Sequence, residues 1–230
     1  MQAKIFTAKI ISKKIIAEDT MEVVFGFESD FDFIAGQYAR IILPKLLYED
    51  EKNYRNFSIA SSPSGKRIVT IAFRESSSGF KRTLLELPVN SAVEIEGAFG
   101  SFNLIEDASR PVVFIAGGIG ITPFMSMLRF AAEQKLPHRI TLIYANQKPE
   151  SAAYLNELEK LEKENQNIVI KTKFGLLDAD FIKKTVDNRL SDVGGQGSNV
   201  AWYIAGPAPM VVATRKNLSE FGVLDKDIYF

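Results

Sequence analysis

The spacing of hydrophobic residues changes once along this chain of 230 residues, near residues 105–111. Before this point, short runs of β-branched and aromatic residues follow one another, separated by turn formers such as SSPSGK and LPVN. After it, continuous apolar runs alternate with segments of helical spacing, beginning with PVVFIAGG and TPFMSMLRFAAEQ. The first pattern predicts a small antiparallel barrel or sandwich, and the second predicts a parallel sheet wrapped by helices. We therefore expect two domains, residues 1–107 and 108–230.

The individual elements follow from the same patterns. In the first half we expect one short helix, over 80–87, and strands over 4–16, 20–27, 36–43, 55–61, 67–75 and 91–97. In the second half we expect strands over 111–118, 139–146, 167–174 and 200–206. Helices are expected over 122–134, 151–164, 178–190 and 207–222. The composition of SDVGGQGSN, residues 191–199, predicts a surface loop.

Composition excludes several classes of function. Positive and negative side chains balance at 28 each, so no global charge favours nucleic acid as a partner. The chain has no cysteine and one histidine, His138, and therefore cannot form a cysteine-ligated metal cluster or a multi-histidine metal site. No apolar run approaches the ~18 residues of a membrane span, and the first residues lack the apolar core of a signal peptide. We expect a cytoplasmic protein without a membrane partner, whose redox chemistry, if any, requires an organic cofactor.

The segment AGGIGITP lies where a buried strand meets a helix. Gly117, Gly118 and Gly120 allow a ligand to approach the backbone, and the helix that follows offers free N–H groups to a phosphate. Thr122 could add a hydroxyl, and Pro123 suits the first helical turn. The spacing differs from the standard dinucleotide fingerprint, and a glycine-rich turn needed only for packing is an equal alternative.

A second strand end favours the ligand interpretation. The segment YIAGPAPM ends a later strand in a turn formed by Gly206 and Pro207. Carboxyl ends of parallel strands meet at one edge of a sheet, so two such turns can hold the two ends of an extended ligand. Pro207 can also serve only to begin a helix.

In the first half of the chain, the segment RNFSIASSP also has two interpretations, one as a packed strand and one as a ligand-binding strand. Arg55 and Phe57 share one face of the expected strand, and Ser58 takes the other. Either this strand carries an exposed arginine and a core phenylalanine, or the three residues contact one long ligand.

Five segments in this order, RNFS, SSGFKRTLLEL, GAFGSF, AGGIGITP and AGPAPM, resemble the motifs of the ferredoxin–NADP reductase family over nearly the whole chain. The resemblance implies an antiparallel Greek-key β-barrel that binds FAD, followed by a parallel α/β Rossmann-like domain that binds NADH or NADPH. It also implies a flavoprotein reductase that transfers hydride from the nicotinamide to FAD. Electrons then pass to a separate acceptor, such as a ferredoxin, flavodoxin, oxygenase component or cytochrome.

The resemblance also implies residue roles. Arg55 would pair with the flavin pyrophosphate, Phe57 would lie against the flavin, and Ser58 would be catalytic, with its hydroxyl near the ring nitrogen that receives hydride. At the start of the short helix, Gly79, Phe80, Lys81 and Thr83 would contact the pyrophosphate. Further candidate cofactor contacts are Asn56, Ile71, Phe73, Gly117, Gly118, Gly120, Thr122, Pro123, Gly206, Pro207, Met210 and Phe230. The sequence departs from the family at Arg82, Ala98 and Ala205, where a serine or threonine, a proline and a cysteine are usual.

Two points stay open. Asn146 and Lys148, after the second strand of the α/β half, are candidate contacts to the adenosine ribose. Lys148 suits the 2′-phosphate of NADPH and Asn146 the hydroxyls of NADH, with a slight preference for NADH. The segment DIYF at the end of the sequence forms a final edge strand, or Tyr229 or Phe230 shields the flavin, or the flavin face stays open, or further residues follow.

Two other functions compete with the reductase. One is a flavin-binding subunit or redox sensor without turnover that acts through a partner protein. The other is a barrel interaction module joined to a nucleotide-binding domain that binds no flavin.

Overall fold

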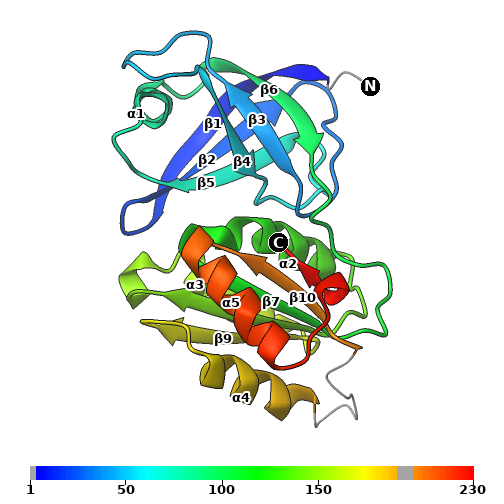
Figure 1. Cartoon of the computed structure of the whole chain (residues 1–230). Helices are drawn as coiled ribbons and strands as arrows, with labels where there is room; N and C mark the ends of the chain where they lie inside the picture. Colours follow the sequence, from blue (N-terminus) through cyan, green and yellow to red (C-terminus); the bar gives the residue numbers. More distant parts are fainter. Residues whose placement is uncertain (1–3, 191–198) are drawn as a thin grey trace. The chain divides into compact units, whose positions relative to one another are not determined.

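The computed structural model describes residues 4–190 and 199–230, shown in Figure 1. Most of the loop predicted over 191–199 lies outside the described residues. The chain forms two compact units. The first unit contains the residues up to Leu104 together with Thr122–Phe130, and the second contains Ile105–Ile121 and Ala131–Phe230.

The first unit is built on a six-stranded antiparallel sheet with the strand order β4-β3-β6-β1-β2-β5. An antiparallel bridge between Ile59 and Ile71 joins the strands at the two ends of this order, so the sheet closes into a barrel. The strands are β1 (Ile5–Ala17), β2 (Thr20–Phe27), β3 (Tyr38–Ile42), β4 (Tyr54–Ser58), β5 (Ile68–Arg74) and β6 (Ala92–Phe99).

The barrel core follows from the alternation of side chains along these strands. In β2, for example, Val23 and Phe25 are fully buried, whereas the residues between and beside them are partly exposed. Helix α1 (Gly79–Glu86) adds Phe80 and Leu84 to the same core. Complete burial of each of these side chains contributes ~1.5–3 kcal/mol. Packing against the barrel therefore fixes the position of a helix that is only eight residues long.

Helix α2 (Ile121–Glu133) contributes Thr122–Phe130 to the first unit. The hydroxyl of Ser126 donates a hydrogen bond to the carbonyl of Ser61 at 2.7 Å. The guanidinium of Arg129 donates to the carbonyl of Ala60, also at 2.7 Å. These two bonds satisfy backbone carbonyls that directly follow β4.

The second unit contains a five-stranded parallel sheet with the order β11-β10-β7-β8-β9. All residues of β7 and β8 are buried, as the continuous apolar sequence of β7 predicts for the first of them. The chain first moves from β7 to β8 and β9, and then returns to the other side of β7 as β10. The strands are β7 (Val112–Gly117), β8 (Ile140–Asn146), β9 (Ile168–Phe174), β10 (Ala201–Ala205) and β11 (Ile228–Tyr229). The helices of this part of the chain are α3 (Leu155–Glu164), α4 (Ala179–Leu190) and α5 (Ala208–Glu220), with 3₁₀ turns at Gly118–Gly120, Pro149–Ser151 and Asp225–Asp227.

The structure confirms the predicted fold class and the final edge strand, in which Ile228 pairs with Trp202. The helix predicted from Ser151 is wrong at its start, because α3 begins only at Leu155. Tyr154 before it has a φ of 62° in the left-handed region, which ends the preceding turn and cannot continue into a helix. None of the helices within the described ranges has the length and apolar character needed to cross a membrane.

Candidate functional site

An anion-binding site forms where β4 meets the start of α1. Arg55, in β4, donates from Nη1 to the carbonyl of Tyr54 at 2.9 Å and forms an ion pair through Nη2 with Oδ1 of Asp50. The other carboxylate oxygen of Asp50 accepts from the backbone N–H of Phe80 at 2.8 Å and from the hydroxyl of Ser78 at 2.7 Å. A guanidinium, a hydroxyl and a helix N-terminus therefore converge on one carboxylate.

The environment of the Asp50 carboxylate strongly favours its ionised form over its protonated form. Its side chain is only 8% exposed, yet each oxygen has hydrogen-bond donors. The Phe80 N–H, the Ser78 hydroxyl and Arg55 hold the pKa of Asp50 well below its usual range, because all three interact with the ionised form. The site thus selects an anion.

The segment 44–53, which carries Asp50, is attached to α1 at further points. The backbone N–H of Leu47 donates to the buried hydroxyl of Thr83 at 3.0 Å, and the Tyr48 hydroxyl donates to Glu86 at 2.5 Å. The guanidinium of Arg82 lies 3.7 Å from the centre of the Tyr48 ring. We call this segment the β3–β4 loop. It covers the first turn of the helix on which the sequence places the pyrophosphate contacts.

Gly79 permits this close approach. A Cβ atom at Gly79 would lie 2.2 Å from the carbonyl oxygen of Glu49 and 2.8 Å from that of Tyr48. The loop therefore requires glycine at the first position of α1. The Lys81 ammonium is directed to the carbonyl of Arg74 at 2.8 Å, and burial, with the nearby Arg55 charge, lowers its pKa. The Ser78 side chain caps the helix by accepting a hydrogen bond from the backbone N–H of Lys81.

An apolar surface adjoins the anion site. Phe57 is half-buried, with its ring centre 5.5 Å from that of Phe73 and 6.1 Å from that of Phe80. The Arg55 guanidinium lies 5.8 Å from the same Phe80 ring, so Arg55 and Phe57 share a face as the sequence predicts. Ile71 has no exposed surface and belongs to the core beneath this face.

Ser58 and Asn56 complete the residues predicted on β4. Ser58 is half-buried at the end of the strand, where it pairs with Tyr38. Asn56 is exposed, and its side-chain oxygen accepts a long hydrogen bond of 3.3 Å from Arg40. Asn56 and Ser58 alternate with Phe57, which places them on the opposite side of the strand from Phe57.

In the second unit, the two predicted glycine turns lie against each other at the ends of β7 and β10. A Cβ at Gly117 would lie 2.3 Å from Sδ of Met210 and 3.1 Å from Cδ of Pro207. A Cβ at Gly120 would lie 2.4 Å from the carbonyl oxygen of Ala205, and one at Gly206 only 3.1 Å from the backbone of Gly117. Packing against backbone therefore requires glycine at Gly120, whereas at Gly117 and Gly206 the nearest atoms belong to the flexible Met210 side chain. The turns also lie at the point where the strand order reverses, which is where open parallel sheets bind ligands.

The neighbouring residues of this region differ in accessibility. Gly118 has a φ of +52°, a conformation that glycine adopts without strain. Thr122 and Pro123 are buried in the first turn of α2. Pro207 is exposed, and Met210 is half-buried.

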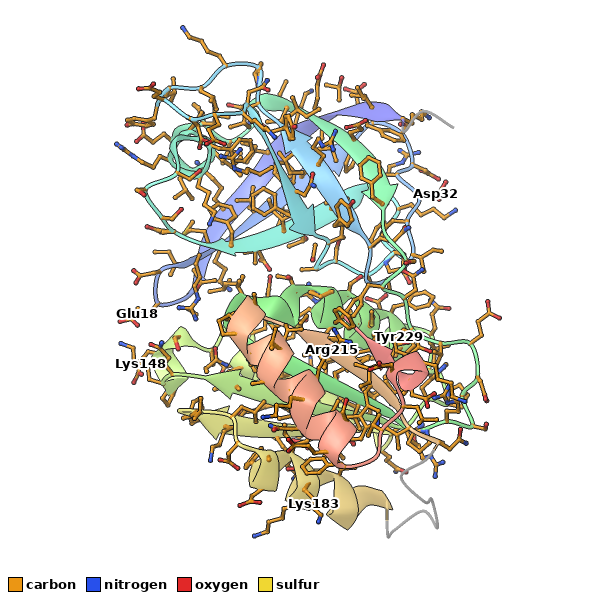
Figure 2. All side chains as sticks on the ribbon, in the orientation of Figure 1. Glu18, Asp32, Lys148, Lys183, Arg215 and Tyr229 are labelled. Carbon is orange, nitrogen blue, oxygen red and sulfur yellow. The ribbon has the colours of Figure 1, made fainter. Side chains whose placement is uncertain are left out.

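Asn146, the last residue of β8, is buried and only 5% exposed. Neither the oxygen nor the nitrogen of its side-chain amide has a hydrogen-bond partner among the described residues. A buried amide without partners is costly, and at the carboxyl end of a parallel strand it indicates a position prepared for a polar ligand. Lys148, labelled in Figure 2, is exposed two residues later.

The last residues of the chain pack within the second unit. Tyr229, labelled with Arg215 in Figure 2, stacks on Tyr203 with ring centres 4.5 Å apart. Phe230 is 63% exposed, and the Arg215 guanidinium lies 4.0 Å from its ring centre. His138 is buried and hydrogen-bonds through Nε2 to the carbonyl of Ile105 at 2.8 Å, which is a structural role.

Asp50 is not among the site residues predicted from the sequence. It lies in the acidic segment YEDEKN, whose composition is that of a solvated loop, and its partners Ser78 and Phe80 follow 28 and 30 residues later. No local pattern indicates this contact. Within residues 4–190 and 199–230, no group of three or more His, Cys, Asp or Glu side chains could hold a metal ion.

The barrel with its anion site and the parallel sheet with its strand-end turns are those of a two-domain oxidoreductase that binds a flavin and a nicotinamide nucleotide. A family model described as an oxidoreductase FAD-binding domain matches residues 7–104, and one described as an oxidoreductase NAD-binding domain matches residues 114–216. The chain belongs to the ferredoxin–NADP reductase-like family, which these two domains define. This result confirms the family resemblance and the expectation that the cofactors are FAD and a nicotinamide dinucleotide.

Individual relatives agree with this assignment. The chain is 28% identical over 234 residues to reductase component 2 of terephthalate 1,2-dioxygenase from a Comamonas species, covering 98% of this chain and 67% of that protein. It is 30% identical over 210 residues to the anthranilate 1,2-dioxygenase electron transfer component from Acinetobacter baylyi, covering 86% of this chain and 57% of that protein. Ferredoxin-NADP+ reductase from Plasmodium falciparum shares the fold, with a TM-score of 0.78, 23% identity, and coverage of 98% of this chain and 95% of that chain.

Proposed function

We propose that this protein is an FAD-dependent NAD(P)H reductase. It accepts hydride from a reduced nicotinamide onto FAD and passes the electrons to a separate acceptor. The observation that carries the proposal is the anion site of the first unit, because its donors already hold a carboxylate. Phosphate oxygens and carboxylate oxygens accept hydrogen bonds from the same groups, so this donor set fits a flavin phosphate.

The residues of the first unit have distinct roles in this proposal. Arg55, Ser78 and the N–H of Phe80 bind the flavin phosphate, and the half-buried ring of Phe57 provides an apolar contact for the flavin. Ser58, at the end of the same strand, orients the ring through its hydroxyl. Bound FAD supplies the exchange between a two-electron donor and a one-electron acceptor. None of these side chains needs to act as a strong acid or base.

The second unit would bind the nicotinamide dinucleotide at the reversal of strand order. The turns containing Gly117, Gly120 and Gly206 lie beside the ends of β7 and β10. The unpaired amide of Asn146 lies at the end of the neighbouring strand β8 and would bind ribose hydroxyls. A preference for NADH over NADPH stays a prediction, because exposed Lys148 suits the 2′-phosphate.

The electron acceptor is proposed from the relatives. Both curated relatives described above are named as reductase or electron transfer components of dioxygenases. A separate oxygenase component or other one-electron carrier is therefore the acceptor that we propose. This chain spans 67% and 57% of the lengths of those two proteins, so its partner need not be theirs. The cytoplasmic location also stays a prediction, and cell fractionation tests it.

An anaerobic absorbance titration tests the proposed function. The protein is reconstituted with FAD and titrated separately with NADH and NADPH, and a one-electron acceptor is then added. We expect the flavin absorbance to bleach with at least one nucleotide and to return with the acceptor. Retained FAD without bleaching by either nucleotide would instead indicate a flavin-binding subunit, and failure to bind FAD would indicate a module without flavin.

A further inference from the structure

We propose that Asp50 is an internal competitor of the flavin phosphate: it occupies the anion site in the flavin-free chain and must leave, with the β3–β4 loop, when flavin binds. This inference rests on the proposed function, because it takes Arg55 and the start of α1 as the phosphate site. It assigns to an aspartate outside the family motifs a role in determining flavin affinity and specificity.

The donors of the anion site are already used by Asp50. The backbone of Phe80 has a single N–H, which donates to the carboxylate at 2.8 Å, and the Ser78 hydroxyl has a single hydrogen, which donates at 2.7 Å. Nη2 of Arg55 pairs with the other carboxylate oxygen, and Nη1 donates to backbone carbonyls. A phosphate cannot take these hydrogens while the carboxylate keeps them.

Charge leads to the same conclusion. The Asp50 side chain is only 8% exposed, so water screens its charge weakly. A phosphate placed beside it would meet a like charge at close range, which is unfavourable. Displacement of the carboxylate removes this repulsion and frees three donors at once. The flavin therefore binds the site only when Asp50 has moved out.

Movement of Asp50 also requires movement of the loop that carries it. The backbone N–H of Glu51 donates to Oδ1 of Asp50 at 2.8 Å, which ties the side chain to its own loop. Only a few polar contacts hold the loop to α1, chiefly those of Leu47 and Tyr48. Leu47 is 55% exposed, so its side chain adds little to this attachment, whereas Leu46 packs against the barrel core and is expected to stay in place.

The test compares the wild-type chain with Asp50→Asn and with Glu51→Gln as a matched control. Both changes remove one negative charge from the same loop, but the exposed Glu51 carboxylate does not contact Arg55. Flavin affinity is measured by fluorescence quenching with FAD, FMN and riboflavin, which has no phosphate. We expect D50N to bind FAD and FMN about tenfold more tightly, whereas riboflavin affinity and all affinities of E51Q change less than about twofold.

The outcomes separate this inference from the proposed function. Unchanged or weaker FAD binding by D50N, or an equal gain for riboflavin, overturns the competitor role while FAD binding by the wild type leaves the function intact. If neither the wild type nor D50N binds FAD or FMN, the proposed function fails, and the inference fails with it.

Hydrogen exchange of the wild-type chain provides a second test that needs no variant to fold. Ligands usually slow amide exchange near their site, but release of the loop predicts faster exchange in the segment 45–51 when FAD is added. Leu47 is the amide that loses its acceptor, the Thr83 hydroxyl on α1. Slower or unchanged exchange in this segment overturns the inference.

Discussion

Substitution of Gly120 by alanine tests the close contact between the two turns of the second unit. The added Cβ would lie 2.4 Å from the carbonyl oxygen, 2.5 Å from the carbonyl carbon of Ala205 and 2.6 Å from the backbone nitrogen of Gly206. Ordinary contacts begin near 3.4 Å, so one backbone must shift by about 1 Å, because no flexible side chain can yield. Overpacking of this kind costs about 1–3 kcal/mol.

The expected thermal shift follows from this free energy. For a chain of this size, about 2–4 °C of unfolding midpoint corresponds to 1 kcal/mol, so G120A should unfold roughly 2–12 °C below the wild type. Calorimetry of the FAD-loaded protein measures the midpoint, and titration with NADH measures the accompanying loss of nucleotide affinity.

Gly65→Ala is the matched control. A Cβ at Gly65 meets only the carbonyl oxygen of Ser62, at 3.8 Å, and the backbone there needs no positive φ. Alanine should therefore leave stability unchanged or raise it by a few tenths of a kcal/mol, through the lower entropy of the unfolded chain. If G120A and G65A unfold at the same temperature, the packing argument for the strand-end turns is refuted.

Three further predictions address the two cofactor sites. Arg55→Lys should weaken FAD binding about tenfold or more in fluorescence titrations, because lysine lacks the forked donor geometry of arginine. The same substitution at the exposed Arg67 serves as the control. Equal losses of FAD affinity in the two variants would contradict the role of Arg55. Because the pKa of Asp50 is depressed below its ordinary value of 3.8, its ionised form stabilises the folded chain above that pH. The stability advantage of the wild type over D50N in urea unfolding should therefore be constant near neutral pH and shrink as the pH falls below about 3.8, and a constant difference down to pH 3 would refute the assignment. Asn146→Leu should change the free energy of unfolding by less than about 1 kcal/mol, because no side-chain hydrogen bond is lost. The same change should weaken NADH binding about two- to tenfold. A large loss of stability with unchanged NADH binding would contradict a ligand role for Asn146.

Residue patterns were sufficient to predict the architecture, because the hydrophobic residues of each strand and helix recur at the spacing typical of that kind of element. The alternation in β2 and the unbroken apolar run of β7 correspond to a strand buried on one face and a strand buried on both. The start of α3 was mispredicted, because Tyr154 adopts the left-handed conformation although tyrosine is not a turn-forming residue type.

The candidate site was only partly predictable. The residues Arg55, Phe57 and Phe80 can be chosen from the sequence, and the structure brings them to one face. The contact of Asp50 with the start of α1 depends on tertiary closure of the barrel, which no local pattern records. The structure also gives the strand-end glycines a packing reason that the sequence could not separate from a ligand reason.

The most direct test of the account is a single-turnover experiment on the FAD-loaded protein without oxygen. Flavin bleaching is followed after rapid mixing with the preferred nicotinamide nucleotide, carrying deuterium at one or the other of its two transferable C4 positions. We expect fast bleaching that deuterium slows at one position only, because hydride moves directly from a bound nicotinamide to the flavin. Absence of bleaching, or bleaching that neither label slows, would contradict hydride transfer between the two cofactors.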